Sequence, residues 1–262
     1  MNSAFDLTDK VVFITGAGRG IGRGIAEVLA EAGANVAMNA LTSTNVDKTA
    51  AAIAEATGRS IVPVTGDVTN TAGATRVVDE VMERFGRIDI LVNNLGDAIG
   101  MPLAALPDKE NSQAIGDVDL QKIIDINMTG TVLCTRAVAP QMLERRSGKI
   151  VNISSYTAGR AGGNVVIYSM AKAAVVGFTR AQALEWASYG INVNAIAPGL
   201  YPEPNAISGE RREQLAKWAK RAIPLGRTGE LREVGYLALY LASPASDYMT
   251  GQTLYLDGGL SL

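Results

Sequence analysis

Short apolar runs alternate with segments of helical periodicity along almost the whole chain, and this alternation constrains the fold more than any other feature. Repeated strand–helix–strand units are the signature of a parallel sheet. The apolar runs are nearly continuous, which is typical of strands buried on both faces. Seven strands are expected, at Val11–Thr15, Asn35–Ala40, Ser60–Thr65, Ile88–Asn93, Lys149–Ser154, Ile191–Ala197 and Thr253–Leu256.

The segments between these runs have the apolar spacing of amphipathic helices. Helices are expected at Ile21–Ala32, Val46–Thr57, Ala72–Phe85, Leu120–Glu144, Val166–Tyr189, Glu210–Ala222 and Glu230–Ala242. The pattern predicts an α/β fold with a doubly wound, parallel, seven-stranded sheet and helices on both faces. No repeat or linker interrupts it, so residues 1–262 are expected to form a single domain.

Composition excludes several classes of function. The chain has no histidine, so histidine-based triads and the usual zinc ligand sets are excluded, and no metal site is expected. Basic residues are scattered, so nucleic acid is not an expected partner. No apolar segment is long enough to span a membrane, and the first residues lack the pattern of a secretory signal. With a single cysteine, Cys134, the sequence is interpreted as that of a cytoplasmic protein without a membrane partner.

A glycine-rich segment, residues 15–22 with the sequence TGAGRGIG, follows the first expected strand and opens the first expected helix. Glycines permit a tight turn and let a phosphate approach the backbone closely. The helix offers unpaired N–H groups and the positive end of its dipole to that phosphate. This order of elements predicts a dinucleotide site on a Rossmann fold.

The pair Tyr168 and Lys172, with Ser155 thirteen positions upstream of the tyrosine, predicts proton-transfer chemistry. Residues four apart share one face of a helix, so the hydroxyl and the ammonium can enter one cleft. A free tyrosine has a pKa near ~10. A positive charge at ~4 Å stabilises the phenolate by roughly 4 kcal/mol at an effective dielectric of ~20. That is about three pKa units and predicts a pKa for Tyr168 near ~7, where acid–base catalysis works best.

Several separated motifs resemble those of the short-chain dehydrogenase/reductase family, in the family's order and across essentially the whole chain. They are the Gly-x-x-x-Gly-x-Gly spacing at Gly16–Gly22, Asn93-Asn94-x-Gly96, Asn127, Ser155, Tyr168-x-x-x-Lys172 and Pro198-Gly199. The resemblance implies that Tyr168 is the general acid or base, that Lys172 lowers its pKa and holds the cofactor's ribose, and that Ser155 stabilises the carbonyl oxygen. It further implies that Asn127 supports a proton relay to Lys172.

Cofactor contacts follow from the glycine-rich segment and from the same resemblance. They are expected at Gly16, Gly18, Arg19, Gly20, Ile21, Gly22, Thr42, Asp67, Val68, Asn93, Gly96, Tyr168, Lys172, Pro198 and Gly199. Asp67 is interpreted as the family's adenine-contacting acid, although an aspartate at a strand end also caps turns. NAD-binding proteins place an acid about twenty residues after the glycine loop, whereas residues 39–43 here read NALTS. Arg19 can pair with a 2′-phosphate, so NADP(H) is favoured over NAD(H).

Two long connections, Gly96–Asp119 and Leu200–Gly229, are expected to form the wall and the lid of a substrate pocket. Asp97 and Glu203 are expected to line its mouth and to favour a hydroxylated or amine-bearing substrate. The chain departs from the family at Leu95, where an alanine is usual, and at Glu203, where a threonine often contacts the nicotinamide amide. The apolar lid residues Leu215, Trp218 and Ala219 favour a partly apolar substrate, although Trp218 can instead pack the lid onto the body.

These observations predict an NADP(H)-dependent oxidoreductase that interconverts a ketone or aldehyde and an alcohol, with 3-oxoacyl thioester reduction as the commonest activity of the family. The alternatives are an NAD-dependent sugar, polyol or secondary-alcohol dehydrogenase, an isomerising or dehydrating enzyme, and a non-catalytic nucleotide sensor. The partner is a small carbonyl or alcohol compound. The segment Val166–Gly190 is apolar around much of its circumference, so it is expected to meet another subunit. The resemblance implies a homotetramer, with a homodimer as the next choice.

Overall fold

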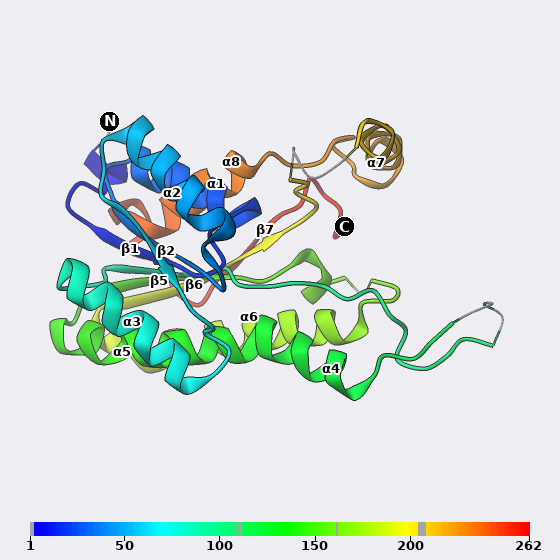
Figure 1. Cartoon of the computed structure of the whole chain (residues 1–262), viewed down its shortest axis with the longest axis horizontal. Helices are drawn as coiled ribbons and strands as arrows, with labels where there is room; N and C mark the ends of the chain where they lie inside the picture. Colours follow the sequence, from blue (N-terminus) through cyan, green and yellow to red (C-terminus); the bar gives the residue numbers. More distant parts are fainter. Residues whose placement is uncertain (1–2, 108, 110–111, 161, 204–207) are drawn as a thin grey trace.

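The computed structural model describes residues 3–107, 109, 112–160, 162–203 and 208–262 (Figure 1). Both long connections that the sequence assigns to the substrate pocket contain residues outside this description. These are residues 108 and 110–111 in the first connection and residues 204–207 in the second. The remaining parts of both connections are described.

Seven strands form one parallel sheet in the order β3-β2-β1-β4-β5-β6-β7, which confirms the predicted doubly wound Rossmann fold. The strands lie within two residues of their expected positions. They are β1 Val11–Ile14, β2 Asn35–Ala40, β3 Ile61–Thr65, β4 Ile90–Asn93, β5 Gly148–Ile153, β6 Ile191–Pro198 and β7 Thr253–Leu256.

Helices cover both faces of the sheet, as Figure 1 shows. Successive side chains of β1 reach both layers, because Val12 and Ile14 join one apolar cluster and Phe13 joins the other. One face is covered by α1 Gly20–Glu31, α2 Ser43–Thr57 and α8 Leu231–Ala242, and the other by α3 Thr71–Phe85, α5 Gly130–Arg145 and α6 Val166–Trp186. Within the described ranges, no helix combines the length and apolarity that a membrane span requires.

The expected single helix Leu120–Glu144 is wrong in one respect. The structure has α4 Asp117–Ile124 and α5, joined by a π-helical turn at Asp125–Thr129. A π-helical turn holds one extra residue and rotates the side chains that follow it relative to those before it. The expected helix assumed regular α-helical spacing throughout and so did not include this shift.

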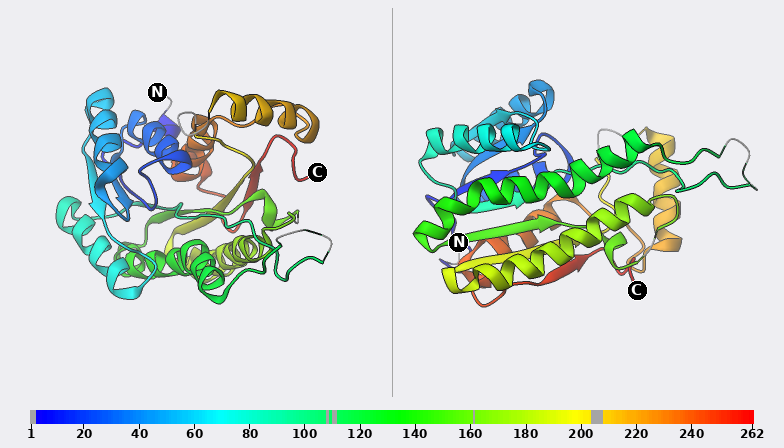
Figure 2. Two further views of the ribbon diagram at one scale, coloured as in Figure 1. Left: turned by 45° about the vertical axis from the view of Figure 1, so that its right-hand side comes forward. Right: turned by 90° about the horizontal axis from the view of Figure 1, so that it is seen from below.

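The chain reverses its direction across the sheet at β1. It proceeds from β1 to β2 and β3 on one side, and later builds β4 to β7 on the other. Ligands of open α/β sheets bind at such a switch point, beyond the carboxyl ends of the strands. Both long connections lie at that end, where α7 Gly209–Ala222 and the extended segment before α4 project from the body (Figures 1 and 2).

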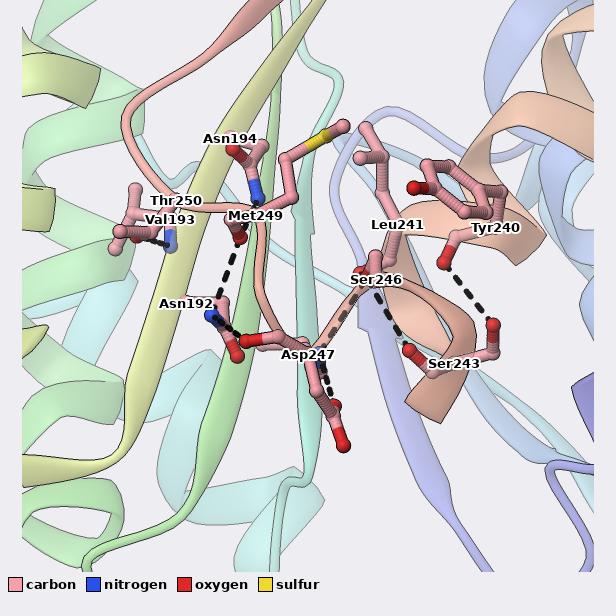
Figure 3. Close-up of polar contacts among 11 residues, drawn as sticks. Asn192, Val193, Asn194, Tyr240, Leu241, Ser243, Ser246, Asp247, Met249 and Thr250 are labelled. Atoms are coloured by element: carbon pink, nitrogen blue, oxygen red, sulfur yellow. Dashed lines mark hydrogen bonds and ion pairs between the residues drawn. The ribbon is translucent and has the colours of Figure 1, made fainter. Parts of the chain in front are cut away.

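Figure 3 shows a polar network that joins β6 to the segment between α8 and β7. The Asn192 side-chain amide donates to the carbonyl groups of Asp247 and Met249, each at 3.1 Å. Asn194 donates to the same Met249 carbonyl at 2.8 Å, and Thr250 Oγ1 accepts from the Val193 N–H at 3.1 Å. These bonds satisfy backbone groups beside β6 and hold β7 in register with it.

Candidate active site

A cavity of about 580 Å³ extends from the glycine-rich loop, Thr15–Gly22, to Ser155, Tyr168 and Lys172, and is called the main cavity below. It therefore brings together the two motifs that the sequence placed far apart. Twelve of the expected site residues line it, namely Gly16, Gly18, Arg19, Gly20, Ile21, Thr42, Gly96, Ser155, Tyr168, Lys172, Pro198 and Gly199.

The glycine-rich loop is tied to the end of β4 by Thr15 and Asn94. The Thr15 hydroxyl oxygen accepts the backbone N–H groups of Asn94 and Leu95, each at 3.0 Å. The Asn94 side-chain amide donates to the carbonyl groups of Thr15 at 3.0 Å and Gly16 at 2.9 Å. A Cβ at Gly22 would lie 2.5 Å from that amide nitrogen, so this position must remain glycine for the loop to pack here.

Asn94, rather than Asn93, is the asparagine that faces the main cavity. The buried Asn93 side chain donates to Thr135 Oγ1 at 2.9 Å and to Asn152 Oδ1 at 2.8 Å, so it belongs to a polar network in the core. Successive side chains of a strand point to opposite faces, which separates the two neighbours. Strand alternation was the one signal that could have selected Asn94 from the sequence.

Two further expected cofactor residues have structural partners. The Asp67 carboxylate accepts the Thr69 N–H at 2.9 Å and the Thr69 hydroxyl at 2.6 Å, and these bonds lower the pKa of Asp67. This is the turn cap that the sequence left open as an alternative. The Val68 side chain is buried in the apolar cluster below the sheet. We therefore do not assign either side chain to the cofactor.

Ser155 follows β5 and begins a short 3-10 turn, Tyr156–Ala158. Its side chain is 5% exposed and lines the main cavity. The preceding residue, Ser154, donates its hydroxyl to the Lys172 backbone carbonyl at 2.9 Å and so fixes α6 against β5. The two serines thus have separate roles, as strand alternation predicts.

Tyr168 lies on the first turn of α6, one helical turn before Lys172. Burial raises the pKa of Tyr168, a hydrogen bond from Ser155 opposes this, and the charges of Tyr156 and Asp97 add to the rise. Lys172 Nζ lies 5.8 Å from the centre of the Tyr168 ring. The expectation of a pKa near neutrality is therefore wrong for this arrangement, because the cost of burial outweighs the hydrogen bond from Ser155.

Lys172 is 2% exposed, and burial lowers the pKa of its ammonium to about 8. Its Nζ donates to the Ile153 carbonyl at 2.9 Å. A Cβ built at Gly96 would lie 2.9 Å from Lys172 Nζ and equally 2.9 Å from Asn127 Oδ1. Gly96 therefore leaves the space that lets these two polar side chains approach one another.

Asn127 owes its position to the π-helical turn. Its amide donates to the carbonyl groups of Asp97 at 2.7 Å and Ile123 at 2.9 Å, and its oxygen accepts the Asp97 N–H at 3.2 Å. The side chain is fully buried. Asn127 thus fixes the wall of the main cavity just after Gly96, beside the Lys172 ammonium.

Comparison with known proteins agrees with this geometry. The sequence profile of a family described as enoyl-(acyl carrier protein) reductase matches residues 16–261. The chain belongs to the short-chain dehydrogenase/reductase family. The 3-oxoacyl-(acyl-carrier-protein) reductase of Synechocystis sp. is 39% identical over 257 residues, which cover 97% of this chain and 98% of that protein.

Other similar members of the family differ in their substrates. Galactitol 2-dehydrogenase from Agrobacterium fabrum is 37% identical over 269 residues, covering 97% of this chain and 98% of that protein. A gluconate 5-dehydrogenase from Burkholderia cenocepacia, crystallised with NADP and tartrate, superimposes with a TM-score of 0.86 at 34% identity, covering 99% of this chain and 98% of that one. This short-chain dehydrogenase/reductase is thus a nicotinamide-dependent oxidoreductase that acts on alcohol or ketone groups.

The residues of this short-chain dehydrogenase/reductase fit a nicotinamide dinucleotide. The main cavity joins the α1 N-terminus, which suits a pyrophosphate, to the Tyr168 hydroxyl in one continuous space. Near the glycine-rich loop its wall contains Arg19, Thr42 and Asn45, a donor set suited to a ribose or a phosphate. The carboxylate nearest to this part is that of Glu203, which accepts the Gly20 N–H at 2.7 Å.

Glu203 differs from its expected position at the substrate mouth. Its carboxylate accepts the Gly20 N–H at 2.7 Å and pairs with the Arg23 guanidinium at 2.9 Å. It therefore places a negative charge at the N-terminus of α1, where the helix dipole stabilises it. Asp97 does line the main cavity, as expected.

The lid segment packs through few apolar residues. In α7 the buried residue is Ala219, which contacts Ile223 and Leu260 in a small cluster. Trp218, which the sequence assigned to an apolar substrate wall, is 38% exposed. Leu215 and Ala219 line a separate hollow between α7 and α8 instead of the main cavity.

Proposed function

We propose that this chain is an NADP(H)-dependent carbonyl reductase in which Ser155, Tyr168 and Lys172 carry the proton chemistry. The observation that supports this best is the main cavity, in which these three residues and the glycine-rich loop share one space. The bound nicotinamide would supply the hydride to the carbonyl carbon, or accept it from the alcohol. The protein's task is to orient the substrate and to move one proton.

Tyr168 gives its hydroxyl proton to the substrate oxygen during reduction and takes it back during oxidation. Its raised pKa keeps the hydroxyl protonated at neutral pH, which suits the direction of reduction. Ser155 donates a hydrogen bond to the oxygen as negative charge develops there. Lys172 stabilises the phenolate that remains, and Asn127 holds the wall through which a water-linked relay would reach the lysine.

We assign the cofactor as NADP(H). Arg19 offers a guanidinium at the glycine-rich loop, and the wall after β2 is formed by Ala40, Leu41 and Thr42, without a carboxylate that would repel a 2′-phosphate. The related gluconate 5-dehydrogenase was crystallised with NADP. Titration of the protein with NADPH and NADH, followed by ligand fluorescence, tests the assignment. Tighter binding of NADH would overturn it.

We propose a 3-oxoacyl thioester as the first substrate class, supported by the similarity to 3-oxoacyl carrier-protein reductases. A polyol or sugar is the second candidate, because Asp97 lines the main cavity and can accept hydrogen bonds from hydroxyl groups. The relative that acts on galactitol supports this alternative. A panel that contains both classes separates them by kcat/KM.

The deciding experiment measures nicotinamide absorbance with this panel, using Tyr168→Phe as the control. We expect the variant to lose at least about 10³-fold in kcat, because the proton donor is removed. Binding of NADPH should persist, since the glycine-rich loop is unchanged. Tight NADPH binding by the wild-type protein without turnover of any substrate would instead support the nucleotide-sensor alternative.

We further propose a cytoplasmic homotetramer with α6 in a subunit interface. Leu184 and Met170 on α6 are 86% and 51% exposed, so apolar side chains of this helix are available for contact with another subunit. The one cysteine, Cys134, is free and buried, so the chain forms no internal disulfide, which suits a reducing compartment. Light scattering should give four chains, and Leu184→Glu should lower that number. Fractionation of the producing cells tests the location.

A further inference from the structure

Thr157 forms hydrogen bonds to Ser155 that have no role in the catalytic set of Ser155, Tyr168 and Lys172 proposed above. Its hydroxyl donates to Ser155 Oγ at 3.0 Å, and its backbone N–H donates to the same oxygen at 3.2 Å. Both residues are almost fully buried, with exposed fractions of 5% for Ser155 and 6% for Thr157. Bulk water therefore does not compete strongly for these bonds.

The contact with Thr157 decides which way the Ser155 proton can point, because a serine makes a limited number of hydrogen bonds. A serine hydroxyl has one proton to donate and two lone pairs with which to accept. Thr157 fills both accepting positions of Ser155. The Ser155 proton is then free to donate into the main cavity, where its bond to the Tyr168 oxygen opposes the rise in the pKa of Tyr168.

We propose that Thr157 is a positioning residue for carbonyl reduction, because its hydroxyl holds Ser155 as a hydrogen-bond donor directed at the substrate oxygen. This inference rests on the proposed function. In the chain Thr157–Ser155–substrate, each hydroxyl donates to the next oxygen, so the bond from Thr157 makes the Ser155 proton a stronger donor. If the hydrogen bond from Ser155 strengthens as negative charge develops on the substrate oxygen, it raises kcat and leaves substrate affinity nearly unchanged.

The 3-10 turn offers a structural explanation for the same contact. An N-terminal serine that accepts a backbone N–H two residues later is a common turn cap, and Ser155 makes this bond to the Thr157 N–H. The backbone bond survives any exchange of the Thr157 side chain. Thr157→Val keeps the shape and the cap and removes only the hydroxyl, so it separates the two explanations.

The test compares Thr157→Val, Thr157→Ser, Ser155→Ala and the double variant Ser155→Ala/Thr157→Val in the NADPH assay. We expect Thr157→Val to lower kcat about 10-fold, the size of one hydrogen bond, with both KM values within about 2-fold of wild type. Thr157→Ser should restore kcat. The double variant should equal Ser155→Ala, because Thr157 acts through Ser155.

A pH profile adds a readout that a purely structural role would not change. In Thr157→Val, the pH at which kcat/KM for alcohol oxidation reaches half its maximum should move upward. This profile reports the enzyme without substrate, in which the Ser155 bond that opposes the rise in the pKa of Tyr168 is weakened. Wild-type kcat in Thr157→Val would overturn the inference, as would multiplicative losses in the double variant. Failure of the proposed function is distinct, because the wild-type protein itself would then turn over no carbonyl substrate.

Discussion

The inner wall and the entrance of the main cavity are built in different ways. Ser155 and Lys172, on the inner wall, are buried and bonded to groups of β5 and its following turn. At the entrance, Asp97 is exposed, and α7 is attached through the small cluster around Ala219. The difference indicates that the chemistry is fixed by the rigid core, whereas the choice of ligand depends on segments that can vary without unfolding it.

Gly96→Ala should displace residues of the inner wall, and we expect it to lower kcat more than the other substitutions compared below. The added methyl group would lie 2.9 Å from both Lys172 Nζ and Asn127 Oδ1, so at least one of them must move. A displacement of ~1 Å at a reacting group can cost ~10²-fold, and we expect a fall of that size in kcat. Steady-state kinetics with a circular dichroism melt checks this. Gly100→Ala, where the nearest atom is 3.9 Å away, is the matched control and should keep its activity.

The inner wall also predicts opposite pH dependences for the two reaction directions. Lys172, with a pKa lowered to about 8, loses its charge as the pH rises through that value. Reduction should therefore fall about 10-fold per pH unit well above 8, while Tyr168 stays protonated because its pKa is raised. Oxidation needs the phenolate and should rise with pH. A rate of reduction that stays constant up to pH ~10 would contradict this assignment of Lys172.

Glu203→Gln tests the N-terminus of α1, where the cofactor pyrophosphate is expected to bind. The Glu203 carboxylate and a cofactor pyrophosphate are both attracted to the α1 N-terminus, so removal of the charge should tighten NADPH binding about 4-fold. Calorimetric titration measures the change. Glu27→Gln is the control, since Glu27 pairs with the same Arg23 at 3.8 Å, whereas Glu203 also accepts the Gly20 N–H at the α1 N-terminus. Weaker NADPH binding in Glu203→Gln would show that the carboxylate supports the cofactor site.

Asp97→Asn should have the smallest effect, and we expect that effect mainly on substrate choice. Asp97 is exposed at the main cavity and repels anionic substrates, but salt screens this repulsion. We expect kcat/KM for a keto acid, relative to a neutral ketone, to rise about 3-fold at low salt and less at high salt. Asp117→Asn at the start of α4 is the control. An unchanged ratio would remove Asp97 from substrate selection.

The sequence predicts the sheet well because each strand is decided by its own residues. Val12, Phe13 and Ile14 are apolar on both faces, and their burial in two separate clusters is what a central parallel strand requires. Most of the expected cavity residues are equally local, since the glycine-rich loop and the Tyr168–Lys172 pair are set by spacing along the chain. Regular periodicity and short motifs therefore suffice for these parts.

The parts that the sequence did not predict depend on neighbours distant in the chain. Glu203 pairs with Gly20 and Arg23, about 180 residues away, and no local pattern specifies that contact. The pKa of Tyr168 follows from how deeply the fold buries it, which spacing along a helix does not give. Asn93 and Asn94 are adjacent in sequence, yet only the orientation of β4 decides which one meets the cavity.

The π-helical turn Asp125–Thr129 makes the site sensitive to the number of residues as well as to their identity. Deleting one residue there would leave a continuous α-helix and, at about 100° per residue, would turn α4 away from its present direction relative to α5. Asn127 would then lose its place beside the lysine, although every side chain named in the chemistry would still be present. In the gene, a change of one codon in length at this turn would therefore misalign the enzyme.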